Sequence, residues 1–548
     1  MRITKISLEN FRSFKAMQSI ELAPLTLLFG PNSVGKSSVL MALAYVQQIL
    51  SKGHCDPQRL DALGHKAIGG FRALVHGQDV DRAIRIRLDF EPGETPFVHY
   101  DSGVEEKAYH VQAPYLLLED LGGNIRVGAV ELEVAWSERH KNAFVKNYRV
   151  WINEVYLGCI SSSDDQKNTT IKELNTQHPL LIPTNNDEWL DLDQRDAGEC
   201  VPLEVGDSQT ELEFVMNQLN PNPANTAALA DIEGAGESFI NRVAPISVAC
   251  QSGAIPILGM PVSTTLVGQE FDEAEEHFNF LVVRQLLSQA FVLPLDQILK
   301  YLESNIQIGP LRLVPDNDYI PSPHPEQSGW VDGSAAWDLL YKDPTSDESI
   351  NRLVRNTSDW LSSSEKLDTG YEIVNRSLYE SLEVDVKPNV GMLGLMSKRH
   401  VFFRELRTNI LLSANQLGTG LSQVLPVIVA SNYAQAGLVT VEQPELHIHP
   451  KFQVELADLF LCSREKHSFI IETHSEHLIL RLLKRIRQSS ENTLPEGVKS
   501  ISEKDVSIVY LEPSESGVLV KHIRIDEGGE FVDRWPQGFF VERREELL

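Results

Sequence analysis

The stretch LLFGPNSVGKSSVL, Leu27 to Leu40, decides how the rest of the sequence is interpreted. It contains the spacing Gly-x-x-x-x-Gly-Lys-Ser, which ends at Ser37. In a loop of this kind the glycines let the backbone approach phosphate groups, and the amides at the start of the next helix point at them. We therefore expect Lys36 to contact the β- and γ-phosphates of a nucleoside triphosphate and the Ser37 hydroxyl to bind Mg²⁺.

The sequence on both sides of the loop has the pattern that a phosphate loop requires. Leu25 to Gly30 is a short apolar run that ends in glycine, which predicts a buried strand. From Lys36 to about Leu50, apolar residues recur at helical spacing. An earlier strand is indicated by Ile3, Ile6 and Leu8. The order strand, loop, helix argues against a coincidental turn rich in glycine.

Composition is typical of a globular protein in a reducing compartment. Hydrophobic residues make up 42% of the 548 positions and charged residues 23%, and this length predicts about two to four domains. The five cysteines are scattered and form no C-x-x-C pair, which indicates reduced thiols and a cytoplasmic location. No apolar run approaches the roughly 18 residues that a membrane span needs, and the start MRITKISLENFRSF lacks the features of a signal peptide, so we expect no membrane partner.

The chain is strongly acidic, with a formal net charge of −28. A nucleic-acid backbone would be repelled on average, so any contact with nucleic acid needs a local basic strip. Two stretches qualify, Lys398 to Arg407 and Arg481 to Arg487. The alternative is that each is a solvated basic face of a strand or helix.

Three segments are expected along the chain. Residues 1–95 would form the N-terminal half of a nucleotide-binding head, 96–400 an inserted β and helical region with partner and dimer surfaces, and 401–548 the C-terminal half. Within the middle segment, helix is predicted from Glu273 to Asn305 with a division at Pro294. Two polar stretches there are expected to be surface loops, Ser161 to Thr170 and Thr184 to Glu199.

A partner for the phosphate loop occurs near the other end of the chain. The apolar run at Leu438 to Val441 predicts a strand, and Glu442 stands at its end, where a carboxylate can anchor Mg²⁺. A second apolar strand follows and ends at Thr473-His474-Ser475. Before both strands, LGTGLSQVLPVIVA contains a glycine turn that opens onto an apolar helix.

These motifs, in this order, resemble the RecF/SMC/OLD-like branch of ABC-type ATPases. The matching stretches are ENFRSF, GPNSVGKSS, GTGLSQVLP, VEQPELHIHP and ETHSEHLILRLL. The resemblance implies an α/β fold: an ABC-type ATPase head (P-loop NTPase) formed by the N- and C-terminal segments, with a large mixed α+β insertion between them. The ending, from IVYLEP to WPQGFF, and the internal IGPLRLVPDNDY are similar to ATPase subunits of prokaryotic defence operons. Septu-type systems, sometimes retron-associated, are the nearest of these, and their ATPase works beside an HNH nuclease.

The resemblance implies a role for each matching residue, with ATP and Mg²⁺ as cofactors. The nucleotide loop would comprise Gly30, Asn32, Gly35, Lys36, Ser37 and Ser38. A signature turn, here Gly418 and Gly420, reads the nucleotide of the other subunit in such heads, so ATP joins two heads into a homodimer. Glu442 would anchor Mg²⁺ with Ser37, and His474 would contact the γ-phosphate. The alternative for His474 is a buried histidine with satisfied hydrogen bonds.

Two residues of the N-terminal segment also match in position. Arg12, within ENFRSF, would reach the nucleotide or a nucleic acid, and its alternative is a surface arginine after a strand. Gln78, within LVHGQD, is placed where a Mg²⁺-sensing glutamine could lie, beside Ser37 and Glu442 in the metal site. The alternative is that Gln78 has no role in sensing Mg²⁺.

The sequence departs from the family pattern at two places. Gly418 occupies the position of the serine that normally begins the signature turn, so its hydroxyl contact is lost unless Thr419 or Ser422 replaces it. Gln443 occupies the position of the glutamate that activates the attacking water. An amide cannot accept a proton, and general-base assistance contributes about 10²–10⁴ in rate. We therefore expect slow hydrolysis, unless Glu445 takes that role.

The pair His447 and His449 stands beside glutamates and raises the question of a further metal site. Because no third ligand lies nearby at metal spacing, the preferred interpretation is that both histidines shape the loop after the acidic strand.

The combined interpretation is an ATP-binding, slowly hydrolysing ATPase that dimerises head to head and regulates or positions an HNH-type nuclease subunit in anti-phage defence. Nucleic acid, as retron or target DNA or RNA, is a further candidate partner. The alternative is a RecF/SMC-like ATPase that clamps or repairs DNA directly. A transporter cassette does not fit the long separation between the halves of the head. Too few residues follow His474 for the nuclease domain of the OLD type, so no nuclease activity of its own is expected.

Overall fold

The chain folds into two compact units, each assembled from segments that are separated in the sequence. Unit 1 comprises Met1–Ser19, Tyr45–Gln58 and Gly69–Lys300, and unit 2 comprises Ile20–Ala44, Arg59–Ile68 and Tyr301–Leu548. The computed structural model describes residues 1–93, 100, 121–181, 211–219, 243, 245–264, 274–380, 396–433, 435, 437–515 and 517–535. The division at residues 95 and 400 stays a prediction.

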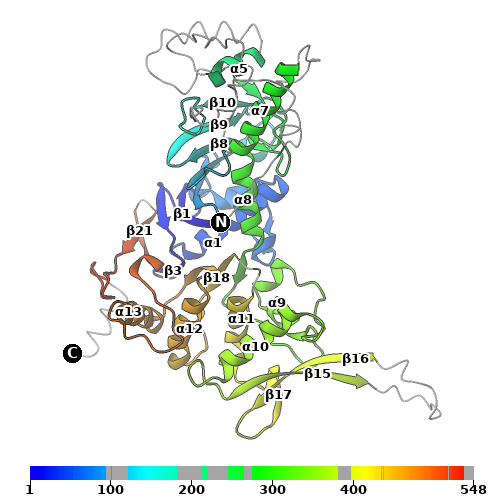
Figure 1. The fold of residues 1–548 in the computed structure, drawn as a ribbon, viewed down its shortest axis with the longest axis vertical. Helices are drawn as coiled ribbons and strands as arrows, with labels where there is room; N and C mark the ends of the chain where they lie inside the picture. The colour runs from blue at the N-terminus through cyan, green and yellow to red at the C-terminus, as the bar shows by residue number, and fades with distance from the viewer. Residues whose placement is uncertain are drawn as a thin grey trace, which may run out of the picture. The chain divides into compact units, whose positions relative to one another are not determined.

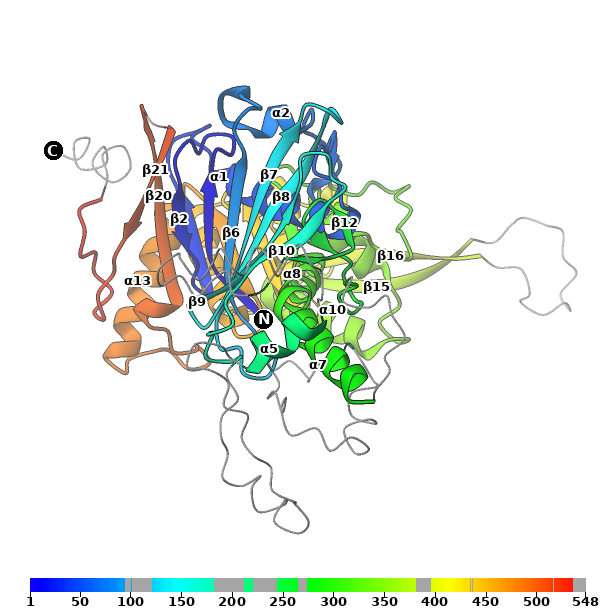
Figure 2. The ribbon, with the colours of Figure 1, turned by 90° about the horizontal axis from the view of Figure 1, so that it is seen from above.

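Unit 1 is organised around an eight-stranded sheet in the order β11-β10-β9-β8-β7-β6-β1-β2. Figure 2 shows β6, β7 and β8 side by side, and each of these pairs is antiparallel. In β6 every second side chain is buried, the alternation of a strand with one face on a core. The strands are β1 (Arg2–Glu9), β2 (Gln18–Glu21), β6 (Ile84–Glu91), β7 (Gly128–Ser137), β8 (Asn142–Ile152), β9 (Val155–Ser162), β10 (Thr169–Leu174) and β11 (Ile246–Ser247).

One polar stretch predicted to be a loop is a loop in its middle and strand at both ends. Ser161 and Ser162 end β9, and Thr169 and Thr170 pair with them at the start of β10, so the turn is confined to residues 163–168. The prediction is confirmed for residues 163–168 and wrong at the two ends, because small hydroxyl side chains tolerate the pleated backbone as long as the ladder satisfies their amides. The second polar stretch, Thr184 to Glu199, lies outside the described residues.

The predicted helical region of unit 1 is divided at the proline as expected. α7 (Ala274–Phe291) ends before α8 (Leu293–Glu303), and Pro294 lies in the first turn of α8, where a missing amide hydrogen costs no helical bond. Among the residues that the structure describes, His277–Glu303 is the one helical stretch long and apolar enough to cross a membrane. Its most apolar window is 83% buried inside the protein, as in a core helix.

Unit 2 contains a six-stranded sheet in the order β14-β18-β19-β3-β20-β21. Its first five strands pair in parallel, and β21 is antiparallel to β20. In Figure 1 the blue N-terminal β3 lies among orange and brown strands from the C-terminal part. The strands are β3 (Leu25–Phe29), β14 (Ile306–Ile308), β18 (Leu438–Glu442), β19 (Ser468–Glu472), β20 (Val506–Ser514) and β21 (Gly517–Ile523). The predicted strands before the phosphate loop and before Glu442 are thus confirmed.

Burial explains why β3 occupies the middle of this sheet. All five of its residues are buried, a continuous apolar run of the kind found in parallel sheets covered on both faces. Because parallel strands of one sheet run in the same direction, β3, β18 and β19 end at one edge. The phosphate loop follows β3 at this edge.

Helices follow the strands of unit 2 closely. α12 begins one residue after His449, whose side chain accepts a hydrogen bond from Lys451 N, and α13 begins after Ser475, whose hydroxyl accepts one from Leu478 N. The longer helices that belong wholly or partly to unit 2 are α1 (Lys36–Lys52), α9 (Ser334–Tyr341), α10 (Glu348–Ser362), α11 (Thr419–Asn432), α12 (Pro450–Ser463) and α13 (Glu476–Ser490).

Smaller elements complete the two units. β15 and β16 form a long two-stranded ribbon, visible in yellow in Figure 1. A short third strand, β17, pairs with β16. The remaining elements are β4 (Arg59–Leu60), β5 (Lys66–Ala67), α2 (Phe71–Leu74), α5 (Glu211–Leu219), β12 (Cys250–Ser252), β13 (Ile255–Pro256), β15 (Tyr371–Glu380), β16 (Met396–Glu405) and β17 (Leu411–Ser413).

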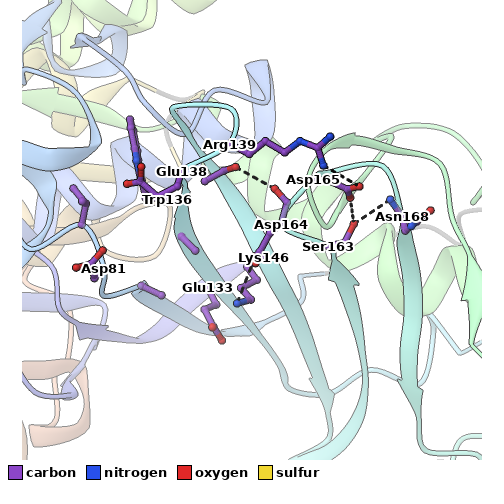
Figure 3. Close-up of a pocket in the computed structure, with 14 residues that line it drawn as sticks. Asp81, Glu133, Trp136, Glu138, Arg139, Lys146, Ser163, Asp164, Asp165 and Asn168 are labelled. Atoms are coloured by element: carbon purple, nitrogen blue, oxygen red, sulfur yellow. Dashed lines mark hydrogen bonds and ion pairs between the residues drawn. The ribbon is translucent and has the colours of Figure 1, made fainter.

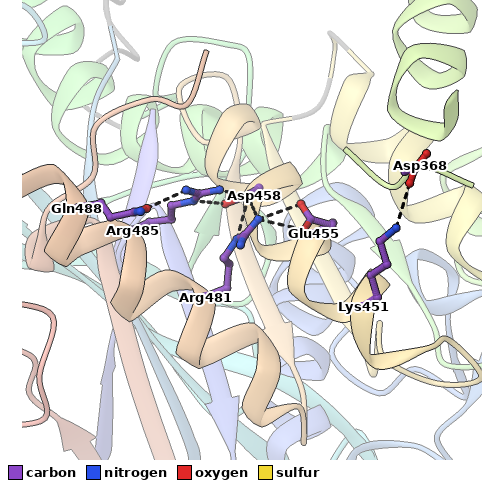
Figure 4. A network of polar contacts seen from close by, with 7 residues as sticks. All are labelled: Asp368, Lys451, Glu455, Asp458, Arg481, Arg485 and Gln488. Carbon is purple, nitrogen blue, oxygen red and sulfur yellow. Dashed lines mark hydrogen bonds and ion pairs between the residues drawn. The ribbon is translucent and has the colours of Figure 1, made fainter. Parts of the chain in front are cut away.

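A buried ion-pair network joins α12 to α13 (Figure 4). Asp458 of α12 accepts from Arg485 Nε at 2.8 Å and from Arg481 Nε at 2.9 Å. Arg481 also binds Glu455 at 3.0 Å. Asp458 and Arg485 are less than one-tenth exposed. The network therefore fixes the position of α12 relative to α13, the two helices that follow β18 and β19.

The same contacts bear on the two basic strips. Arg481, Arg485 and Arg487 of the second strip each have an acidic partner within unit 2. In the first strip Arg399 pairs with Asp343 and Arg404 with Glu372. These arginines are thus engaged with carboxylates of the protein, which favours the ordinary interpretation of both strips.

We predict that Asp458→Ala lowers the free energy of unfolding by about 3 kcal/mol, because it leaves the buried guanidinium group of Arg485 without its carboxylate, whereas Arg481 keeps Glu455. The measurement is the midpoint of urea unfolding of the full chain. As a matched control, Glu465→Ala removes a carboxylate from the exposed pair with Lys499 and should shift the midpoint little. Equal shifts in the two variants would contradict the role given to the network.

Candidate functional site

The phosphate loop connects β3 to α1 in a conformation that glycine permits. Gly30 and Gly35 have φ angles of 141° and 122°, and Ser33 has a φ of 63°. A Cβ atom on Gly30 would lie 2.4 Å from the carbonyl oxygen of Leu511 in β20, so only glycine fits there. Asn32 is exposed at the tip of the loop. The sheet thus shapes the loop that the sequence marks as the phosphate site.

Lys36 is buried at the start of α1 and is held by the loop itself. Its Nζ donates to the carbonyl oxygens of Gly30 and Pro31, each at 3.0 Å, and lies 3.7 Å from Glu472 Oε1. Burial lowers the pKa of Lys36, and the charges of Glu472 and Glu445 oppose that shift. The ammonium group is therefore positioned inside the loop.

Ser37 faces two carboxylates from neighbouring strands. Its Oγ donates to Glu472 Oε2 at 2.8 Å and lies 3.5 Å from Glu442 Oε2. Glu442 and Glu472 are directly paired residues at the ends of β18 and β19. Gln307, the middle residue of β14, donates to the other oxygen of Glu442 at 2.9 Å. Burial raises the pKa of Glu442, and the neighbouring charge of Glu472 raises it further.

Glu445 ties the loop after β18 to the loop after β19. One carboxylate oxygen accepts from Thr473 Oγ1 and the other from the backbone N–H of His474, both at 2.7 Å. Burial raises the pKa of Glu445, although these hydrogen bonds oppose the shift. Both oxygens of this glutamate are thus engaged in positioning the histidine loop.

His474 has a buried nitrogen without a partner. Within the part of the chain that the structure describes, its Nε2 has no hydrogen-bond partner. Burial lowers the pKa of His474, and the positive charge of Lys36 lowers it further, which favours the neutral imidazole. The alternative of a histidine with satisfied hydrogen bonds therefore does not hold. An acceptor placed between Lys36 and His474 would satisfy this nitrogen, which is what a phosphate oxygen supplies.

Gln443 follows Glu442 in a left-handed turn with a φ of 47°. Its backbone N–H donates to the carbonyl oxygen of Glu472 at 2.7 Å. The turn directs the chain from the strand end into the segment that carries Glu445. It thereby places an amide side chain where relatives of the resembled branch carry a glutamate.

Arg312 is a buried residue of this site that the sequence reasoning did not identify. Its guanidinium donates to backbone carbonyl oxygens of Glu442, Gly309 and Gln423 at 2.9–3.0 Å. Burial lowers the pKa of Arg312 to about 10. The Gln423 side chain returns two hydrogen bonds to the Arg312 backbone. Arg312 therefore joins the end of β18 to α11, the helix of the signature turn.

The two glycines of the signature turn have different surroundings. Gly418 is the N-cap of α11, and a Cβ on it would meet no atom within 4 Å. A Cβ on Gly420 would lie 2.6 Å from the carbonyl oxygen of His447, so this glycine allows close packing on the loop after β18. Ser422 is buried and donates within its own turn, whereas Thr419 is exposed. Of the two proposed replacement hydroxyls, only that of Thr419 faces outward.

Two predicted residues belong to unit 1. Arg12 N donates to the carbonyl oxygen of Leu74, and His76 Nδ1 lies 2.7 Å from the Arg12 carbonyl oxygen. Gln78 follows in the same segment with a φ of 60° and is exposed. The two residues therefore occupy adjoining turns of unit 1. Their roles toward nucleotide, nucleic acid and Mg²⁺ stay predictions.

The histidine pair has structural roles in unit 2. His449 caps α12, and His447 adopts a left-handed turn with a φ of 62°. Among the described residues no group of three or more His, Cys, Asp or Glu side chains is arranged to hold a metal ion. A separate metal site at these histidines therefore has no support.

A cavity of about 850 Å³ lies in unit 1, along β7, β8 and the turn after β9 (Figure 3). Its charged side chains are largely paired with one another: Arg139 lies 3.7 Å from Asp165, and Lys146 lies 3.8 Å from Asp164. These pairings account for the polar lining without a ligand.

The residues around Lys36 fit a magnesium-bound nucleoside triphosphate. They supply a glycine loop, a buried ammonium group, a hydroxyl with two adjacent carboxylates, and a neutral imidazole with a free nitrogen. Hard oxygen ligands of this kind suit Mg²⁺. Glu472, Gln307 and Arg312 were missed from the sequence, although the position of Glu472 at the end of an apolar strand beside the TH motif was a usable signal.

Comparison with known proteins agrees with this arrangement. A family model described as an AAA ATPase domain matches residues 1–188 and 336–479, together more than half of the chain. This match, with the parallel sheet of unit 2, confirms the predicted α/β P-loop ATPase head with an insertion. No curated protein matches the chain.

Solved structures of SMC heads are similar only at a low level. The SMC head domain from Thermotoga maritima is 9% identical, with 96% of this chain and 100% of that chain covered and a TM-score of 0.35. The Smc head domain bound to the C-terminal domain of ScpA, derived from Pyrococcus furiosus, is 11% identical, with 100% and 98% covered and a TM-score of 0.35. TM-scores of this size do not support an inference about function.

Proposed function

The chain belongs to the AAA ATPase domain family, and from that premise we propose that it is an ATP-gated head that closes as a dimer and regulates a partner nuclease. The observation that supports nucleotide binding best is the convergence of Lys36, Ser37 and His474 with the strand-end carboxylates. Bound Mg²⁺ would neutralise phosphate charge. Lys36 and the loop amides would hold the phosphates, and His474 would contact the terminal one.

Hydrolysis is proposed to be slow. Gln443 cannot accept a proton from an attacking water, and general-base assistance is worth about 10²–10⁴ in rate. Glu445 is a poor substitute because both of its oxygens already accept hydrogen bonds from Thr473 and His474. A site that binds ATP but turns it over slowly suits a sensor that stays closed while the nucleotide is present.

We propose that two heads dimerise through the signature turn because this turn is exposed. The N-terminal turn of α11 begins at exposed Gly418 and Thr419, and the open space around Gly418 leaves its amides accessible to a phosphate held by another subunit. The packing of Gly420 against the loop after β18 couples this turn to the Mg²⁺ side of the same head. Arg312 provides a second connection between the same two elements.

A nuclease partner in prokaryotic defence is proposed from the resemblance to Septu-type subunits, with a cytoplasmic location. The direct alternative, a DNA-clamping ATPase, would need free basic groups, whereas most arginines of the two basic strips pair with acidic residues. That observation favours action through a protein partner.

The partner is tested by co-expressing the chain with the HNH protein of a neighbouring reading frame and purifying it through a tag on the chain. We expect the nuclease to co-purify, and we expect ATP to change its yield or its activity. The purified chain alone should neither cleave DNA nor bind it tightly at physiological salt. Tight, salt-sensitive DNA binding by the chain alone would instead support the clamp.

If Gln443 is the cause of slow hydrolysis, Gln443→Glu should raise the turnover of ATP by about tenfold or more. The reason is that a carboxylate next to Glu442 can accept a proton from the attacking water, which an amide cannot. The measurement is steady-state phosphate release at saturating ATP. Glu445→Gln is the comparison: turnover that is unchanged by Gln443→Glu but lost in Glu445→Gln would assign the base to Glu445 and contradict the proposal.

The dimer proposal predicts that Gly418→Asp abolishes ATP-dependent dimerisation, because a carboxylate at this turn would face the phosphates of the other subunit. Gly418→Asn is the matched control of equal size without the charge and should still dimerise. Both residues are good N-caps, so neither should destabilise α11. Light scattering of each variant with and without ATP measures the effect, and a dimer that forms equally in both would count against this surface.

A further inference from the structure

We propose that Glu472 is a second metal-anchoring carboxylate of the nucleotide site and makes ATP binding depend on a divalent cation. The inference deepens the proposed function and rests on it. Glu472 ends β19, immediately before the Thr473-His474 pair. The metal site predicted from the sequence comprised Ser37, Gln78 and Glu442, with Glu442 as its one carboxylate.

The hydrogen bonds of Ser37 favour Glu472 over Glu442. Ser37 Oγ lies 2.8 Å from Glu472 Oε2, a well-formed bond, and 3.5 Å from Glu442 Oε2, at the limit of one. Glu442 also accepts from Gln307 at 2.9 Å, which draws its carboxylate toward β14. In the structure, therefore, the hydroxyl expected to bind Mg²⁺ is held chiefly by Glu472.

The strand ends hold both carboxylates in fixed positions. Glu442 and Glu472 are opposite one another in the parallel pair of β18 and β19. The Glu472 carbonyl oxygen accepts from Gln443 N at 2.7 Å, and Thr473 N donates to the carbonyl oxygen of Leu28 in β3. Glu472 is only 7% exposed. Its carboxylate is thus presented from the core of the sheet, next to the helix that begins with Lys36.

The charge balance explains why a divalent cation is needed. Without nucleotide, Lys36 Nζ lies 3.7 Å from Glu472 and partly balances its charge. The positive charge of Lys66 acts on Glu442, and Arg312 is engaged with backbone carbonyl oxygens. When a triphosphate binds, Lys36 contacts its phosphates and no longer balances the charge of Glu472. The negatively charged phosphates would then face the buried carboxylates of Glu442 and Glu472. A divalent cation between the carboxylates and the phosphates removes that repulsion.

The isosteric change Glu472→Gln separates charge from shape. The amide oxygen can still accept from Ser37, but the repulsion against metal-free ATP is lost. Metal-free ATP should therefore bind roughly tenfold more tightly than to the wild type, and added Mg²⁺ should improve binding much less. Glu472→Asp keeps the charge and should restore part of the dependence on Mg²⁺.

The experiment measures binding of a fluorescent ATP analogue to the full-length chain, first in EDTA and then over a titration of Mg²⁺. Glu491→Gln removes one negative charge from an exposed position after α13 and serves as the control with wild-type behaviour. Lys36→Ala should lose binding under both conditions, which confirms that the signal comes from this site.

The outcomes are distinguishable. Tighter metal-free binding and a weakened Mg²⁺ response in Glu472→Gln, with recovery in Glu472→Asp, would support the proposal. Normal ATP binding in Glu472→Gln with an unchanged Mg²⁺ response would overturn this inference and leave the proposed ATPase intact. Failure of the wild type to bind the analogue at any Mg²⁺ concentration would overturn the proposed function and this inference together.

Discussion

The position of β3 between β19 and β20 is the constraint on which the site depends. Both neighbours come from the far end of the chain, and both run parallel to β3. Strands that run together end together, so the loop after β3 must lie beside the ends of β18 and β19. The contact of Lys36 with Glu472 follows from this pairing and from no local preference of either segment.

The elements that build this arrangement could be predicted because their signals are local. β3 is an uninterrupted apolar run, α1 has helical spacing, and the strand ending at Glu442 has the same short apolar character as β3. The meeting of Ser37 with Glu442 could also be expected, since the order of motifs matches a known type of head. Local pattern and motif order are thus sufficient for the fold and for the approach of Ser37 to Glu442.

What could not be predicted depends on register and on buried polar contacts. That Glu472 lies opposite Glu442 depends on how two strands align, and a shift of one residue would have turned it to the other face. Arg312 lies in an irregular segment and is buried because backbone carbonyl oxygens satisfy its guanidinium, a pattern that hydropathy does not reveal. For Ser161 to Thr170 the polar composition correctly indicated a loop at residues 163–168, but it could not show that strand pairing makes the two ends of that stretch part of a sheet.

The assembly of unit 2 from distant segments affects synthesis of the chain. The phosphate loop is synthesised more than four hundred residues before both strands that flank β3, which lie beyond residue 467. Until they emerge, the buried apolar face of β3 has no partner, and closing such a long loop is slow compared with local folding. The sheet around β3 can therefore form only after β19 and β20 have been synthesised.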